Sequence, residues 1–140
     1  MRSPELFPSL LGAASSIAFA AFSGTALFNL FAWVNGGNEL SLLDAASAAS
    51  NSPVYAMLSI IFMVLAGVLG GMAAAKLSGH GPYVNALTSA MFVLMWSLVL
   101  IASPVSAATA EVITIIEGFV LPIPCALFGA YAFARLADVG

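Results

Sequence analysis

Four long apolar stretches, with nearly all charged residues lying between or beyond them, dominate this sequence. They cover residues 7–34, 53–77, 83–103 and 111–136. Each holds at least about 20 residues, which at about 1.5 Å per helical residue can cross a hydrocarbon core of roughly 30 Å. No alternating strand pattern appears, and backbone exposed to lipid must satisfy its hydrogen bonds within its own helix. The sequence therefore predicts an all-α integral membrane protein, a four-transmembrane-helix antiparallel bundle forming one domain over residues 1–140.

The composition excludes an ordinary soluble fold. Hydrophobic residues make up 62% of the chain and charged residues 6%, whereas a soluble domain carries roughly 25% charged residues. Such a chain cannot cover its surface with polar groups, so we expect the lipid bilayer to be its surroundings. Three basic residues are too few to neutralise a nucleic-acid backbone, which excludes that class of partner.

The basic residues also predict the orientation. Arg2, Lys76 and Arg135 all fall on the side that the two termini share with the second connection, and the acidic residues of the other two connections lie opposite. By the positive-inside rule, both termini face the cytoplasm. The first stretch is longer than the roughly 7–15 apolar residues of a signal peptide and therefore reads as a first span. We expect a bacterial cytoplasmic (inner) membrane location.

Residues typical of helix starts and turns lie between the apolar stretches. Ser41 and Asp44 form the pattern of a capping box with Asp in place of Glu, followed by alanine-rich sequence. This pattern favours a short interfacial helix in the first outer loop over an ordered loop without helix. Ser52 followed by Pro53 is typical of a helix N-cap and first turn. A Gly- and Pro-containing turn over residues 78–82 separates the second and third spans.

Rows of small residues recur at every fourth position in the first two stretches. The row in the first stretch is Gly12, Ser16, Ala20 and Gly24. The row in the second stretch is Gly67, Gly71, Ala75 and Gly79, with Ala66, Gly70, Ala74 and Ser78 beside it. Small side chains let helices approach closely in lipid. The rows are consistent with a dimer or subunit interface, but packing inside one four-helix unit is the favoured explanation.

Glu117 is the one acidic residue well inside an apolar stretch, and Pro122 and Pro124 follow it closely. Because proline cannot donate to the preceding turn, the sequence predicts a helix kink at these two positions. The alternating directions of the spans place Asn29, Ser59 and Ser97 at a depth similar to that of Glu117.

An intramembrane carboxyl group is costly enough to suggest a function by default, so these four residues form a candidate polar site for a proton or cation. The alternative is a buried neutral glutamic acid that hydrogen bonds a neighbouring helix and holds the packing.

The sequence contains no recognisable catalytic chemistry. It has one histidine and one cysteine, His80 and Cys125, and no Ser/His, Asp/Asp or metal-ligand set, so we expect no enzyme, no metal and no cofactor. The favoured function is a small accessory or scaffold subunit that packs laterally against other membrane subunits and lipid. The alternative is a small oligomeric ion- or proton-coupled transporter or channel that uses Glu117. The expected partners are accordingly other membrane subunits or further copies of this chain.

Overall fold

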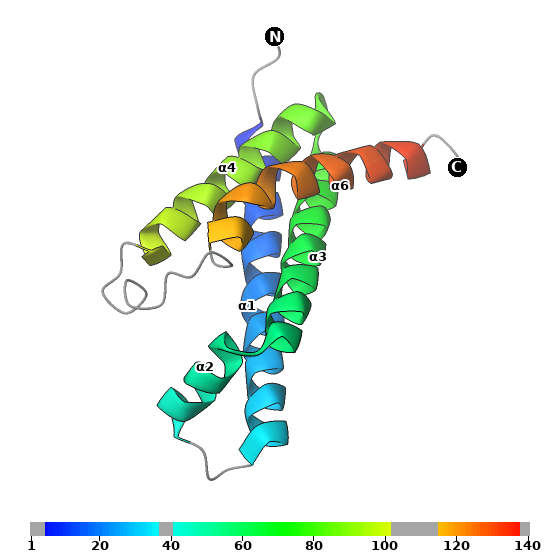
Figure 1. Ribbon diagram of the computed structural model, residues 1–140. Helices are drawn as coiled ribbons and strands as arrows, with labels where there is room; N and C mark the ends of the chain where they lie inside the picture. Colours follow the sequence, from blue (N-terminus) through cyan, green and yellow to red (C-terminus); the bar gives the residue numbers. More distant parts are fainter. Residues whose placement is uncertain (1–4, 37–40, 102–114, 138–140) are drawn as a thin grey trace.

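The structure is a computed structural model that describes residues 5–36, 41–101 and 115–137. Its helices are α1 (Leu6–Gly36), α2 (Leu42–Ser50), α3 (Pro53–Leu77), α4 (Pro82–Ile101), the π-helical turn η2 (Ile116–Val120) and α6 (Pro122–Ala137) (Figure 1). No strand occurs within these ranges. The predicted all-α class is therefore confirmed.

Three of the helices are long and apolar enough to cross a membrane, namely α1, α3 and α4. Their limits agree with the predicted stretches to within two residues where the structure describes both ends. The predicted stretch over residues 111–136 differs, because its described part is not one continuous helix. The turn η2 is followed by a bend at Leu121, and α6 begins at Pro122. The 16 residues of α6 extend about 24 Å, which is shorter than a hydrocarbon core of roughly 30 Å.

The predicted caps begin two of the helices. The amide of Tyr55 donates to the Ser52 hydroxyl oxygen at 3.3 Å, with Pro53 in the first turn of α3. The amide of Asp44 donates to the Ser41 hydroxyl oxygen at 3.2 Å, so the short helix α2 also follows the prediction. These caps satisfy amides that have no partner within the helix.

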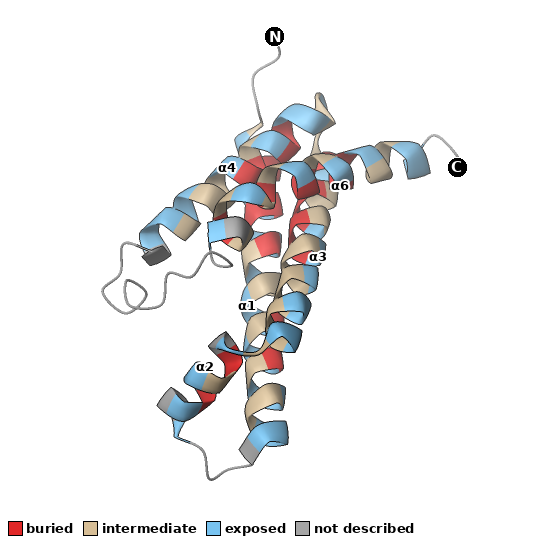
Figure 2. Cartoon of the chain, in the orientation of Figure 1, coloured by how far each residue is buried: buried red, intermediate tan, exposed pale blue. Residues whose placement is uncertain are grey.

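The helices pack most closely at one end of the molecule. In Figure 1, α1 and α3 stand side by side, while α4 and α6 cross them near the upper end. Figure 2 shows that most buried residues gather at this crossing, where the start of α1 meets the end of α3. The C-terminal half of α1 is mostly exposed or half-buried. Most of the packed core therefore lies toward the end at which α1 begins, and a smaller buried set, Leu27, Ala45 and Ala49, lies on α1 and α2 away from that end.

The small-residue rows let the helices approach at this crossing. A Cβ atom on Gly12 would lie 2.7 Å from the Ala74 Cβ and 2.7 Å from the Gly70 carbonyl oxygen, so α1 packs on the row that contains Gly70 and Ala74. A Cβ atom on Gly71 would overlap the Ala126 backbone of α6. The row on α1 therefore packs on the α3 row that contains Gly70 and Ala74. The α3 row that contains Gly67 and Gly71 faces α6 instead.

The remaining members of the rows also have defined places. Gly67 meets Cys125 of α6, and Ala75 belongs to a buried cluster with Ala86 and Ala130. Gly24 has open space where its side chain would be. Among the small residues of α1, Gly12 and Ser16 therefore make the close contacts with α3.

Candidate functional site

A cavity of about 270 Å³ lies between the helices. Elements α1, α3, α4, η2 and α6 all contribute to its wall. Most of the lining is aliphatic or alanine, and the polar groups come from Ser16, Trp96, Ser97 and Glu117. An apolar cavity with a few convergent polar groups is the usual form of a small-molecule site.

Small side chains create this space. The lining includes Ser16 and Ala20 of α1 and Ala66 and Gly67 of α3. Further toward the start of α1, similar residues are in contact, as at Gly12. The same row of small residues therefore closes the gap at one depth and leaves it open at another.

The π-helical turn η2 brings Glu117 to the cavity. Pro122 and Pro124 lack an amide proton, so the α-helical hydrogen-bond pattern cannot run unbroken through them. The chain instead forms the wider turn η2 and bends at Leu121. Single π-helical turns are frequent at functional sites. A Cβ atom on Gly118 would lie 3.3 Å from the Ser97 Cβ, which shows how closely η2 packs on α4.

The Glu117 carboxyl group is only partly satisfied. Its Oε1 atom is enclosed and has no hydrogen-bond partner among the described residues. The Ser59 hydroxyl of α3 and the Tyr55 phenol both lie close enough to the carboxyl group to interact with it. A carboxyl oxygen without a partner in a cavity is free to bind a proton, a cation or a hydrogen-bond donor.

The structure brings together three of the four residues predicted to share this site. Ser59 and Ser97 both lie next to η2, and the Ser97 hydroxyl donates to the Val93 carbonyl at 3.1 Å, which leaves its oxygen free to accept. Asn29 is exposed and does not line the cavity. Ser16 of α1 lines the cavity instead. It lies 13 residues before Asn29, which is about 20 Å along the helix axis at about 1.5 Å per residue.

Ser16 and Trp96 are the polar lining residues whose role the sequence did not indicate. Ser16 belongs to a row of small residues and was expected only to pack, and Trp96 fits an interfacial aromatic residue. Neither residue type carries a local signal of cavity lining. Only the rotation of each helix about its axis brings these side chains to one space.

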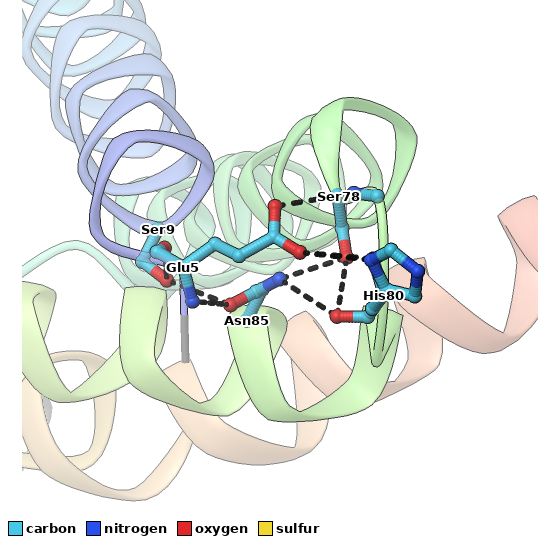
Figure 3. Close-up of polar contacts among 6 residues, drawn as sticks. Glu5, Ser9, Ser78, His80 and Asn85 are labelled. Atoms are coloured by element: carbon cyan, nitrogen blue, oxygen red, sulfur yellow. Dashed lines mark hydrogen bonds and ion pairs between the residues drawn. The ribbon is translucent and has the colours of Figure 1, made fainter. Parts of the chain in front are cut away.

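A second polar cluster ties the start of α1 to the turn between α3 and α4 (Figure 3). At its centre Asn85 is fully buried. Its Oδ1 accepts from the Glu5 amide at 2.7 Å and from the Ser9 hydroxyl at 3.4 Å, while its Nδ2 donates to the Ser78 hydroxyl oxygen at 2.7 Å and to the His80 carbonyl at 3.5 Å. We call this cluster of Glu5, Ser9, Ser78, His80 and Asn85 the N-terminal clasp.

Glu5 completes the clasp from the exposed side. Its carboxylate accepts from the amides of Gly79 at 3.1 Å and His80 at 2.9 Å, and one of its oxygens lies 3.9 Å from His80 Nδ1. No local pattern in the sequence indicates this cluster, since Glu5 and Asn85 lie 80 residues apart. Both polar atoms of the Asn85 side chain have partners, so Asn85 joins the helices and offers no free group to a ligand.

The described residues contain no group of three or more His, Cys, Asp or Glu side chains that could hold a metal ion. Cys125 is a free, buried thiol against Gly67 of α3. Among the described residues, the cavity around Glu117 is therefore the clearest candidate for a functional site.

A comparison with protein families, with curated proteins and with solved structures finds no match to this chain. The function must be inferred from the geometry of the helices alone.

Proposed function

We propose that this chain is a small accessory subunit of a larger membrane protein complex and that it contacts its partner through the C-terminal half of α1. The observation that supports this proposal is the exposed Asn29 side chain. It lies seven residues before the end of α1 at Gly36, and no hydrogen bond joins it to any residue that the structure describes. A carboxamide facing lipid lacks partners, whereas a polar side chain of a neighbouring helix can supply them.

The residues around Asn29 form one face of the helix. Phe22, Ala26, Leu30 and Trp33 repeat at helical spacing with it and are all exposed, with Phe22 77% and Trp33 69% exposed. Side chains three, four and seven positions apart share a face. A mainly apolar face with one central amide suits a transmembrane helix that carries a polar group at the same depth.

The proposal includes four crossings of a bacterial cytoplasmic membrane, with η2 and α6 forming part of the fourth. The start of α1, the turn between α3 and α4, and the end of α6 lie toward the same end in Figure 1. Lys76 and Arg135, in the last turns of α3 and α6, lie toward that end. The positive-inside rule then orients both termini to the cytoplasm.

Site-specific photocrosslinking in the native membrane tests this function. A photoreactive residue replaces Asn29 on the proposed contact face, and Leu69, exposed on α3, serves as the control position. We expect one defined adduct from position 29 and none from position 69, together with loss of the co-purified partner in Asn29→Leu. Equal labelling from both positions, or adducts with copies of this chain alone, would contradict the proposal.

A second candidate function is ion- or proton-coupled transport, and the enclosed Glu117 Oε1 atom favours it. In proteoliposomes, Glu117→Gln should abolish a proton- or cation-dependent flux because the amide retains hydrogen bonding but cannot carry charge. Asp44→Asn is the matched control, since Asp44 is an exposed carboxylate on α2. Flux that persists undiminished in Glu117→Gln would rule out this candidate.

A further inference from the structure

We propose that the cavity beside η2 binds a small organic ammonium ion, with Glu117 as its counter-charge and Trp96 beside its cationic group. This inference concerns a ligand of the chain itself and does not depend on the accessory-subunit proposal, which rests on the opposite half of α1. It follows from the size, charge and lining of one cavity.

The cavity has the size of a small organic molecule. Its volume of about 270 Å³ lies near the lower limit of small-molecule pockets, which is roughly 300 Å³. A water molecule in the liquid takes up about 30 Å³, so a single ion would leave most of the space unfilled. Hard metal cations also require about six or more oxygen ligands, whereas Ser16, Ser97 and Glu117 are the oxygen-bearing side chains of the lining.

An ionised Glu117 has no cationic partner in the described part of the chain, so a cation that enters the cavity would supply its counter-charge. The enclosed Oε1 of Glu117 has no hydrogen-bond partner there, and an unpaired charge in a buried position is strongly unfavourable. Lys76 is exposed at the far end of α3, 17 residues from Ser59, which is about 25 Å along the helix. Arg135 donates to the Tyr131 hydroxyl, and the His80 ring lies beside Glu5. None of these three groups reaches the cavity.

The lining suits both ends of an organic ammonium ion. Its cationic group can donate to the Glu117 carboxylate and to the Ser97 oxygen, which lies close to η2. Trp96 lines the same cavity, and indole is the strongest aromatic partner of a cation. The Ile17 and Met63 side chains offer apolar surface to the hydrocarbon part of the ligand.

Binding of phenethylammonium to the protein in lipid nanodiscs tests the inference, with 2-phenylethanol as the neutral probe of similar shape. Trp33→Phe removes the other tryptophan of the chain, so that fluorescence reports on Trp96 alone. We expect saturable binding of the ammonium probe. We also expect Glu117→Gln to weaken it at least about tenfold, as loss of a buried charge partner requires. Asp44→Asn should leave the affinity unchanged.

A second pair of variants tests the cavity without altering any charge. Ala20→Leu fills the lining, whereas Ala18→Leu adds the same atoms to an exposed position outside it. We expect only Ala20→Leu to abolish binding of phenethylammonium. If Glu117→Gln does not fold, this pair still tests whether the ligand binds in the cavity. Equal affinity for the alcohol would overturn the inference. Unchanged binding of phenethylammonium in both Glu117→Gln and Ala20→Leu would also overturn it, as would saturable binding of sodium ions without binding of phenethylammonium.

Discussion

Replacing Asn85 with alanine should destabilise the protein more than any other single amide deletion in the described helices. Asn85 is 0% exposed, and its side chain makes two hydrogen bonds of 2.7 Å, one to the Glu5 amide and one to the Ser78 hydroxyl. Each such bond contributes about 1 kcal/mol net, and each buried group left without a partner costs about 1–3 kcal/mol. Together with the space left by the missing amide, we expect the free energy of unfolding to fall by about 2–4 kcal/mol.

The measurement is unfolding by SDS titration in mixed micelles, followed by far-ultraviolet circular dichroism. Asn35→Ala is the matched control, because Asn35 is exposed and, among the described residues, its side chain donates only to the Phe31 carbonyl one turn earlier. That control should change the free energy by no more than about 0.5 kcal/mol. A double-mutant cycle with Ser78→Ala should show a coupling energy of at least about 0.5 kcal/mol. Equal effects of Asn85→Ala and Asn35→Ala, with no coupling, would refute the role assigned to the clasp.

Two further predictions concern helix packing and capping. Gly71→Ala should lower the free energy of unfolding by about 1–3 kcal/mol in the same titration, because the added methyl group overlaps the Ala126 backbone. Gly24→Ala, with open space around it, should be neutral or stabilising by up to about 1 kcal/mol; a larger loss at Gly24 than at Gly71 would contradict this packing. Ser41→Ala removes the cap that the Asp44 amide uses, so amide hydrogen exchange in α2 should accelerate by the equivalent of about 1 kcal/mol; unchanged exchange would show that the cap contributes nothing.

The helical elements were predictable because their signals are local. The limits of α3 coincide with the predicted stretch, since Ser52 and Pro53 begin it and a turn with Gly81 at φ 75 follows it. The Ser41 cap of α2 was recognisable for the same reason. A cap or a proline acts on amides within one turn, so neighbouring residues in the sequence are sufficient to reveal it.

The candidate site was predictable only in part. Depth along each span, which depends on residue count and helix rise, placed Ser59 and Ser97 near Glu117, and in the structure both lie next to η2. The same reasoning misplaced Asn29, whose side chain is exposed. Ser16 of α1 lines the cavity instead, 13 residues before Asn29, because a residue count does not show where along α1 the other helices cross it.

The sequence by itself determined the apolar helices, their caps and the break before Pro122, because hydropathy and backbone chemistry act over a few residues. The tertiary structure alone decided that Gly70 faces Gly12 while Gly71 faces Ala126, and that Ser16 shares a cavity with Glu117. The physical reason is that helices in lipid are apolar on all sides, so no polar face marks which side turns inward. Their rotation and crossing depend on the summed close contacts of all helices, which exist only once the chain is folded.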